Sequence, residues 1–517
     1  MNSENKVSAK ANSLNRAKLY QLVLFPFNNG ATNVYFILTL NFIAYYANGV
    51  LGLLLTFATT MVTVMRLFDA VTDPIIGALL DRTVTRFGKF RPFMVLGNVI
   101  LIVSVLLLYF GIRIVPADMM WLRYTLFVLF YALYVIGYTF QTACTRSGQS
   151  CLTNDPNQRP LFTVFNTVSS LVGMGLVQFL APVIARRYGG YNRAEFFDFM
   201  IPLAIVVSAI LTMLAVIGIW EKDREEFFGV GGKQEAVKFS EYLAILKENT
   251  ELLRLMVAGA GCKLAFSIAT NMTVLCMLYG SMMNNYDGLY LPMMVVGYVF
   301  SVPFFILTVR TSQKHGQKAA LVRYTGLALV MYVIVLGLLC AWRRGDPAFN
   351  LSFGNMNLYT ILFVLFFGIG YGAYYATADM SIPMVADCSD YETFRTGRYI
   401  PGIMGTLFSL VDKMVSSLGS TIVGGAVAAI GIATLPDGYT PYSEGMHAIV
   451  VVLFCVVPML AWIATLIAMR GYKLTGARMK EIQAINAVRK DAIAKGMSLK
   501  EAMEKWQTIE QVPDEFK

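Results

Sequence analysis

Three ionisable residues interrupt an apolar stretch near residue 70. Arg66, Asp69 and Asp73 are spaced i, i+3 and i+7, which places them on one stripe of a helix. Two close carboxylates can hold a Na⁺ through their oxygens or share a proton, and acids within a membrane segment are functional by default. The simpler interpretation, neutralisation of Arg66 for packing, leaves one acid without a charge partner on this helix. The spacing therefore favours a cation site at Asp69 and Asp73, with Arg66 as charge partner.

A second stripe with the same spacing occurs near residue 140, in Thr139, Thr142 and Arg146. The planar fork of arginine suits a carboxylate, a sulfate or a phosphate. Arg146 could instead pair with Asp69 or Asp73 in an empty cavity, and the sequence leaves both interpretations open. The other ionisable residues within apolar stretches are Lys263, Asp379, Asp412 and Lys413, of which Lys263 is expected to be a second charge partner. Four cations and four acids in such stretches suggest mutual pairing around an internal water-filled path.

The composition shows what must surround these residues. The chain has 517 residues, of which 56% are hydrophobic and only 14% are charged. A soluble fold cannot bury that apolar share, so soluble, secreted and nucleic-acid-binding classes are excluded despite a net charge of +10. The seven cysteines show no metal-ligand spacing. The lipid bilayer is therefore the expected surroundings.

Apolar runs of about 20 residues, the length that crosses a bilayer, recur along the chain. They predict twelve spans, at 20–47, 50–79, 92–113, 121–150, 160–186, 199–220, 253–284, 289–310, 320–342, 356–386, 399–431 and 445–470. The predicted parts are an N-terminal tail (1–19), a six-helix bundle (20–220), a central loop (221–252), a second six-helix bundle (253–471) and an amphipathic tail (472–517).

Lysine and arginine are distributed unequally between the predicted loops. Most lie in the two tails and in the loops that follow the even-numbered spans, the central loop among them. The loops that follow the odd-numbered spans carry only Arg113, Arg123, Arg186, Arg187, Arg193, Arg343 and Arg344. Because cytoplasmic loops are enriched in these residues, both termini, the central loop and the amphipathic tail are expected in the cytoplasm. The prediction is a multi-pass protein of the cell (plasma) membrane.

Two sequence blocks resemble a known family. The first comprises DAVTDP (69–74), GALLDR (77–82) and GKFRP (88–92), and the second is ADCSDYETFRTGR (386–398), followed by Lys413. This pattern is similar to that of the glycoside-pentoside-hexuronide:cation symporters of the major facilitator superfamily, which include the melibiose carriers. The resemblance implies an all-α polytopic membrane protein with the major facilitator fold, in which twelve transmembrane helices form two six-helix bundles.

The resemblance also implies roles for individual residues. Thr139, together with Thr72, would complete the cation site beside Asp69 and Asp73, and Lys413 would lie between the cation and the solute. Charged residues at helix ends are expected to form a cytoplasmic gate that breaks in each transport cycle. These residues are Asp81, Arg82, Arg91, Asp387, Asp390, Glu392, Arg395 and Arg398.

The expected solute site departs from the pattern of the melibiose carriers. Thr142 and Arg146 stand where those carriers have an Asp and a Trp, and Asn33 replaces an Asp. The cavity is thereby more positive, with Lys413 and Lys263 as further cations, which suits an anionic hexuronide. Tyr375 and Asp379 lie one turn apart on the tenth span and are further candidates for solute contacts.

The sequence thus predicts a transporter, not an enzyme, that moves a sugar or glycoside with Na⁺ or H⁺ by alternating access. It is expected to be monomeric, to need no cofactor besides the coupling cation and to bind no nucleic acid.

One alternative is transport of a non-sugar organic solute on the same fold. Another is an intramembrane DxxxD enzyme, which would need a second acid-rich copy facing the first. A nontransporting sensor would need a larger output domain than the C-terminal tail provides.

Overall fold

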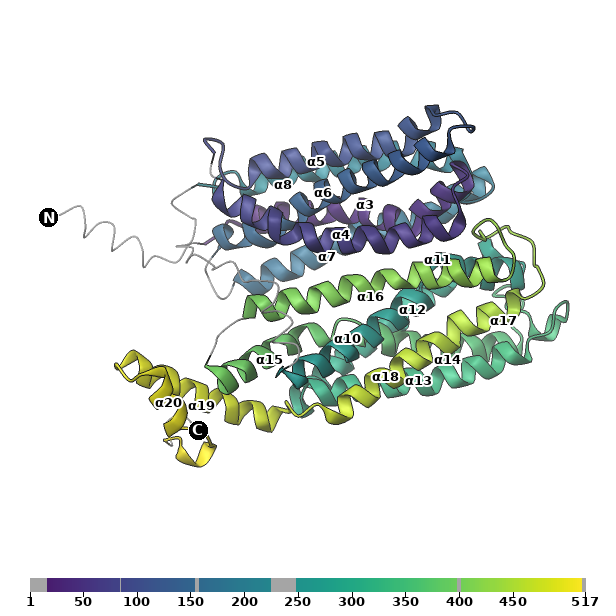
Figure 1. Cartoon of the computed structure of the whole chain (residues 1–517). Coiled ribbons are helices and arrows are strands. Elements are labelled where there is room, and N and C mark those ends of the chain that lie inside the picture. The colour runs from purple at the N-terminus through teal and green to yellow at the C-terminus, as the bar shows by residue number, and fades with distance from the viewer. Residues whose placement is uncertain (1–15, 84, 154–157, 225–247, 398–400, 514–517) are drawn as a thin grey trace. The chain divides into compact units, whose positions relative to one another are not determined.

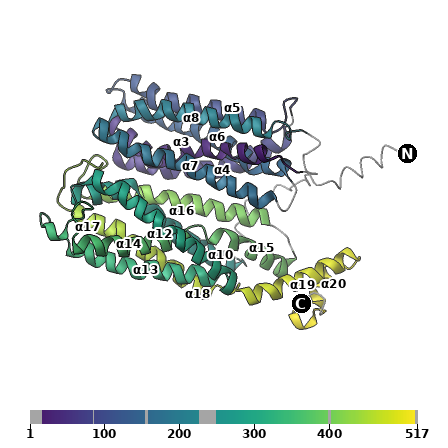
Figure 2. The same cartoon turned by 180° about the vertical axis from the view of Figure 1, so that it is seen from behind.

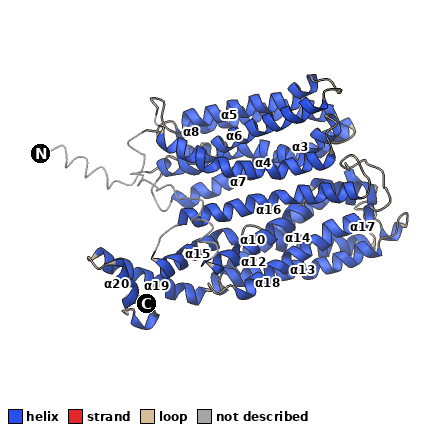
Figure 3. Cartoon of the chain, viewed as in Figure 1, coloured by secondary structure: helices blue, strands red, loops and turns tan. Residues whose placement is uncertain are grey.

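The structure is a computed structural model that describes residues 16–83, 85–153, 158–224, 248–397 and 401–513 (Figure 1). Throughout these ranges the chain is helical or lies in loops, and the described residues form no strand (Figure 3). An all-helical chain suits a bilayer, because the backbone N–H and C=O groups of a lipid-facing helix are bonded within their own segment. The predicted fold class is confirmed.

Two compact units divide the chain. Unit 1 lies within Met1–Gln234 and includes the short segment Gly431–Asp437, whereas unit 2 lies within Glu235–Ile430 and Gly438–Lys517. The short segment belongs to unit 1 because side chains of that unit bind its backbone. The Tyr45 hydroxyl donates to the Pro436 carbonyl at 2.7 Å, and Asn48 Nδ2 donates to the Ala433 carbonyl at 3.1 Å.

The helices of unit 1 follow one another through short connections. They are α2 (Leu19–Leu24), α3 (Phe27–Tyr45), α4 (Leu55–Arg82), α5 (Arg91–Leu106), α6 (Met120–Leu152), α7 (Gln158–Tyr188) and α8 (Ala194–Ile219). Helix α3 contacts α4, α6, α7 and α8, and α4 contacts α6. The α4–α6 contact brings together the two polar stripes identified in the sequence.

The C-terminal tail adds two helices, and the seventh, tenth and twelfth predicted spans each comprise more than one helical element, so unit 2 contains more helices than its predicted spans. Figure 2 shows unit 2 from behind. Its α-helices are α10 (Thr250–Ala269), α11 (Met272–Leu275), α12 (Tyr286–His315), α13 (Gln317–Ala341), α14 (Leu358–Thr377), α15 (Ser381–Thr396), α16 (Pro401–Ala429), α17 (Met446–Val451), α18 (Val457–Gly471), α19 (Gly476–Ala494) and α20 (Leu499–Lys505). The seventh span is interrupted after α10 and continues through α11 into a π-helix, Cys276–Met282. Residues 387–396, predicted to lie in a loop, form the second half of α15.

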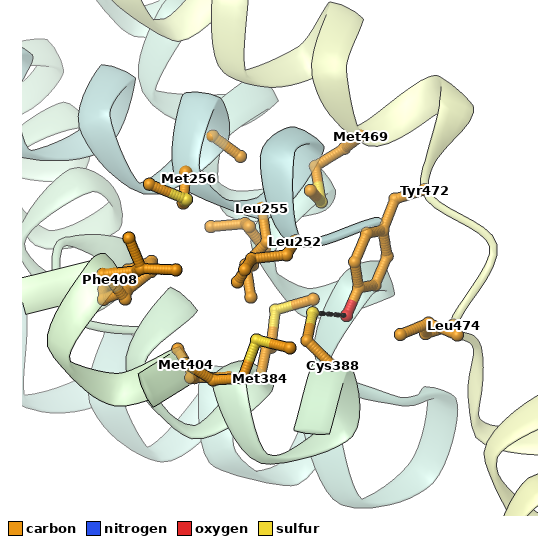
Figure 4. Packing of buried hydrophobic residues seen from close by; sticks show 14 of the residues in the cluster. Leu252, Leu255, Met256, Met384, Cys388, Met404, Phe408, Met469, Tyr472 and Leu474 are labelled. Carbon is orange, nitrogen blue, oxygen red and sulfur yellow. Dashed lines mark hydrogen bonds between the residues drawn. The ribbon is translucent and has the colours of Figure 1, made fainter. Parts of the chain in front are cut away.

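Ten helical segments of the described chain are long and apolar enough to cross a membrane. Helices α3 and α16 are two further long helices, so the architecture is consistent with the twelve predicted spans. Helix α3 is not among those ten segments, and it carries four asparagines, Asn28, Asn29, Asn33 and Asn41, which lower its mean hydropathy. An apolar core in unit 2 joins α10, α15, α16 and α18, and Figure 4 shows Leu252 and Met384 between Met404 on one side of this core and Tyr472 on the other.

Candidate functional site

The acid at the centre of the first stripe, Asp69 on α4, is buried, with 1% of its surface exposed. The Thr139 hydroxyl on α6 lies 2.9 Å from Asp69 Oδ1 and also 2.9 Å from the carbonyl of Val135. Because a hydroxyl has one proton, it can donate to only one of these oxygens at a time. Thr72 donates to the Asp69 carbonyl at 3.0 Å, and its hydroxyl lies 3.3 Å from that of Thr139. The structure therefore gathers carboxylate and hydroxyl oxygens, the donor set that a Na⁺ prefers.

Arg66 closes one side of this group. Its Nη1 lies 3.3 Å from Asp69 Oδ2, and its guanidinium carbon lies 5.0 Å from the ring centre of Phe36. A cavity of about 20 Å³ adjoins Arg66 and Asp69. Its lining also includes Tyr131, Tyr134 and Tyr138. That volume has room for one water, which could supply a further oxygen beside Asp69.

The second acid of the stripe, Asp73, pairs with Arg146 of α6. Arg146 Nη1 lies 3.5 Å from Asp73 Oδ2, which is longer than a charged hydrogen bond of about 2.7–2.9 Å. The Arg146 side chain is 63% exposed, in contrast to 22% for Asp73. The structure thus forms the pairing that the sequence left open, and most of the guanidinium still lies outside the pair.

The other solute-site candidates of unit 1 bond within their own helices. The Thr142 hydroxyl donates to the carbonyl of Thr139 at 3.1 Å. The Asn33 amide donates to the carbonyl and to the side-chain oxygen of Asn29, at 2.8 and 2.9 Å. Asn29 was not singled out from the sequence, although it precedes Asn33 by one turn of the same helix.

Unit 2 has its own charged cluster, in which one lysine meets two acids. Lys263 of α10 forms an ion pair with Asp379, which lies between α14 and α15, and its Nζ is 3.9 Å from Asp412 Oδ1 on α16. The sequence predicted Lys263 as a charge partner but did not specify which acid it would reach, and in the structure that acid is Asp379. Lys413 is buried, with 7% of its surface exposed.

Tyr375, one turn before Asp379, lies in an aromatic cluster. Its ring stacks on Tyr371 with centroids 5.5 Å apart and meets Tyr298 edge-on at 5.8 Å. Phe266 and Phe305 lie at 5.4 and 5.7 Å. Because the ring is surrounded on several sides, packing accounts for much of its position, and only its half-buried remainder is accessible to a solute.

Some of the predicted gate residues are not described. Arg398 lies outside the described residues, and the side chains of Asp81 and Arg82 are likewise outside the described part of the structure. Asp387 is half-buried on α15. Arg91 Nε lies 3.3 Å from Asp223 Oδ2, so its observed ion pair is within unit 1.

The remaining gate candidates have partners within unit 2. Asp390 Oδ2 accepts from Gln483 Nε2 at 3.2 Å. Glu392 is buried, accepts from Asn249 Nδ2 at 2.9 Å and forms an ion pair of 2.9 Å with Arg395. These bonds tie α15 to the start of α10 and to the C-terminal helices.

Sequence reasoning missed Asp223, the acid that organises the connection between α4 and α5. It is 1% exposed and accepts from the backbone N–H groups of Lys89, Phe90 and Arg91 at 2.8–3.1 Å. Nearby, Lys18 Nζ donates to Glu221 at 2.9 Å, and this hydrogen bond raises the pKa of Lys18 and lowers that of Glu221. The available signal was an acid just after the sixth apolar span.

Comparisons with known proteins agree with the architecture. A family profile described as MFS/sugar transport protein matches residues 29–476. The "Putative glycoside/cation symporter YagG" of Escherichia coli (strain K12) is 25% identical over 464 residues, which cover 86% of this chain and 89% of that relative. The "Glucuronide carrier protein homolog" of the same strain is 25% identical over 475 residues, covering 89% of this chain and 94% of that protein.

Among solved structures, a bacterial homologue of the human drug peptide transporters PepT1 and PepT2 superposes with a TM-score of 0.56. The match covers 90% of this chain and 100% of that chain at 13% sequence identity. Identity this low shows a shared fold and carries no information about the solute.

Proposed function

The chain belongs to the MFS/sugar transport family, and from that premise we propose that it is a secondary active transporter that moves a sugar or glycoside together with a cation. The names of the relatives support this function, since they include a glycoside/cation symporter and a glucuronide carrier homolog. Alternating access between the two six-helix bundles would carry the solute across the membrane. We place both termini in the cytoplasm, on the Lys and Arg distribution, and propose a monomer in the cell membrane.

The observation that carries the proposal is the buried Asp69 with a hydroxyl at its carboxylate. A buried acid is costly unless it is paired or binds a cation, and Asp69 has both Arg66 and Thr139 at bonding distance. We assign the coupling cation to Asp69 and Asp73, with Thr139 and Thr72 as neutral ligands. Na⁺ and H⁺ both suit this donor set.

For the solute, the residues support an anionic glycoside such as a hexuronide. Arg146 contributes an exposed guanidinium, and Thr142 and Asn33 contribute neutral polar groups. From unit 2 we assign Lys413 to the coupling of solute and cation, and Tyr375 and Asp379 to solute contacts. Lys263 remains the charge partner that holds Asp379.

The test is solute accumulation in proteoliposomes that contain the purified full-length protein. Methyl β-D-glucuronide and methyl β-D-glucoside are offered with an inward Na⁺ gradient, an inward H⁺ gradient or neither. We expect a gradient of one cation to drive accumulation of at least one of these sugars. An ionophore that collapses the gradient should abolish the accumulation.

Asp69→Asn and Asp73→Asn should each abolish accumulation but leave downhill exchange, because the solute site remains while the cation site is lost. Asp118→Asn, which neutralises an exposed acid in a loop, is the matched control and should transport normally. Accumulation that survives in both single variants of α4 contradicts the assignment of the cation site.

A further inference from the structure

Two Arg–Asp pairs occur where α4 faces α6, and they differ in the solvent exposure of their side chains. In the first, Arg66 and Asp69 have side chains only 18% and 2% exposed, and Phe36 covers the guanidinium. In the second, Arg146 is 63% exposed and reaches Asp73 with one nitrogen at 3.5 Å. Because arginine carries five N–H donors in a planar fork, the second pair leaves most of its donors directed elsewhere. The first pair is thus closed to an incoming anion, whereas the second is open to one.

The Arg146 guanidinium competes with any cation that approaches Asp73. A monovalent cation at this acid would bring a second positive charge to a carboxylate oxygen that already faces a guanidinium at 3.5 Å. Like charges this close disfavour each other, so the affinity for the cation falls while Arg146 is in place. Withdrawal of Arg146 from Asp73 therefore raises the affinity of the site for the cation.

An anionic group on the solute can withdraw Arg146. A carboxylate can engage two guanidinium N–H groups at once, which gives a stronger pair than the single long contact to Asp73. The hydroxyls of a neutral glycoside carry no charge with which to replace the Asp73 carboxylate. The exchange is thus selective for the charge of the solute.

We propose that the Arg146–Asp73 ion pair is exchangeable and couples the two substrates. The anionic group of the solute takes Arg146, and the coupling cation takes the place of Arg146 at Asp73. No covalent bond is made or broken, and the local charge stays balanced because one anion and one cation enter together. The inference rests on the proposed function, and it makes Arg146 the residue through which solute and cation increase each other's affinity.

Thermodynamic linkage makes this measurable by binding alone. If the solute raises the affinity for the cation, the cation raises the affinity for the solute by the same factor. Purified protein is titrated with NaCl at constant ionic strength, and with H⁺ by a pH series in choline chloride. Each titration is done without sugar, with methyl β-D-glucuronide and with methyl β-D-glucoside, and intrinsic fluorescence and the melting temperature report binding.

In the wild-type protein, the glucuronide should raise the apparent affinity for the coupling cation at least about fivefold, within the usual range of coupling between sites. The glucoside should change it less than about twofold. Arg146→Gln should raise the affinity for the cation in the absence of sugar and abolish the effect of the glucuronide. Arg146→Lys keeps the charge without the fork and should retain part of the effect.

Arg187→Gln is the matched control, since Arg187 is an exposed arginine of the same unit in the last turn of α7. It should behave as wild type in every titration. Asp73→Asn provides a second, independent readout. Without its carboxylate partner, Arg146 should bind the glucuronide equally well with and without the cation.

The outcomes separate the inference from the proposed function. If Arg146→Gln leaves both the cation affinity and the effect of the glucuronide unchanged, the exchange is refuted. Gradient-driven accumulation in the transport assay would still support the proposed function. If the glucoside is as effective as the glucuronide, the exchange is also refuted. If neither sugar accumulates under either gradient, the proposed function itself fails.

Discussion

A single hydroxyl is shared between the helix that carries it and the acid that faces it. Thr139 lies 2.9 Å from Asp69 Oδ1 and 2.9 Å from the carbonyl of its own helix at Val135. When a cation occupies Asp69, the hydroxyl can donate to Val135 and present its lone pairs to the cation. The side chain can therefore act as a donor in the empty site and as a ligand in the filled one.

This dual role predicts the effect of two substitutions. Thr139→Val keeps the shape but removes the oxygen, and it should raise the half-saturating cation concentration about tenfold, as for a hydrogen bond of about 1–1.5 kcal/mol. Thr139→Ser keeps the oxygen and should stay within about threefold of wild type by the same reasoning. The measurement is sugar accumulation in proteoliposomes against cation concentration. Equal values for the two variants would show that the hydroxyl is not a ligand.

Lys263 holds two acids of unit 2 together, so its removal should leave them in mutual repulsion. We expect Lys263→Met to destabilise the protein by about 1–3 kcal/mol, less than for a fully buried pair because Asp379 is largely exposed. Adding Asp412→Asn should recover part of the loss, since it removes one of the two negative charges. Melting temperatures of the purified variants test this. A double variant no more stable than Lys263→Met would contradict the shared pairing.

At the scale of elements, the connection between α4 and α5 is built around Asp223. Three consecutive backbone N–H groups, of Lys89, Phe90 and Arg91, point at its carboxylate. Gly88 makes this turn possible, because its φ of +106° disfavours other residues and a Cβ there would collide with the Asp223 carboxylate. The motif residues of this loop therefore have a structural role within unit 1.

Gly88→Ala should accordingly lower the stability of unit 1 more than backbone strain alone. Gly189→Ala is the matched control, because Gly189 also has a positive φ, +79°, but no atom lies where its Cβ would be. We expect a cost of about 1 kcal/mol for the control and at least about 2–4 kcal/mol for Gly88→Ala, which also displaces charged hydrogen bonds. Thermal unfolding of both variants measures the difference. Equal losses would mean that the turn adjusts around Asp223 without cost.

The spans themselves were predictable because about 20 consecutive apolar residues leave little alternative to a membrane helix. Their interruptions were not. Helix α10 ends at Ala269 and Asn271 caps α11, yet the apolar run continues to residue 284. Spacing on one helix likewise predicted the stripe of Arg66, Asp69 and Asp73. It could not predict which acid each cation of another helix would reach, since that depends on how helices rotate against one another.

At the scale of the whole molecule, the C-terminal tail shows what the sequence could not specify, namely where an amphipathic segment docks. It was predicted as an amphipathic segment, and it forms α19 and α20 around a small apolar core that includes Ile485 and Trp506. Arg489 is 7% exposed and donates to the carbonyl of Trp506 at 2.6 Å and to that of Phe394 on α15 at 2.7 Å. Burial lowers the pKa of Arg489. The tail is thus an ordered part of unit 2 docked on α15.

Replacing Arg489 should undock this part. Arg489→Met keeps much of the apolar contact but leaves two buried carbonyls without their donor, and it should cost about 2–4 kcal/mol. Limited proteolysis and hydrogen exchange of residues 476–505 should then increase. Lys490→Met, at the exposed neighbouring position, is the control and should protect the tail as wild type does. Unchanged protection in Arg489→Met would show that the apolar core alone holds the tail.

Because the tail is bonded to α15, a probe on the tail can report movements of α15, the helix that carries Asp387, Asp390 and Glu392. The described helix α20 is exposed at Lys500, and Cys340 is the exposed cysteine among the seven, the other six being buried. A Cys340→Ser, Lys500→Cys protein can therefore carry one nitroxide or fluorophore on the tail that is docked on α15. A rotation of α15 during transport would then be read as a displacement of the probe.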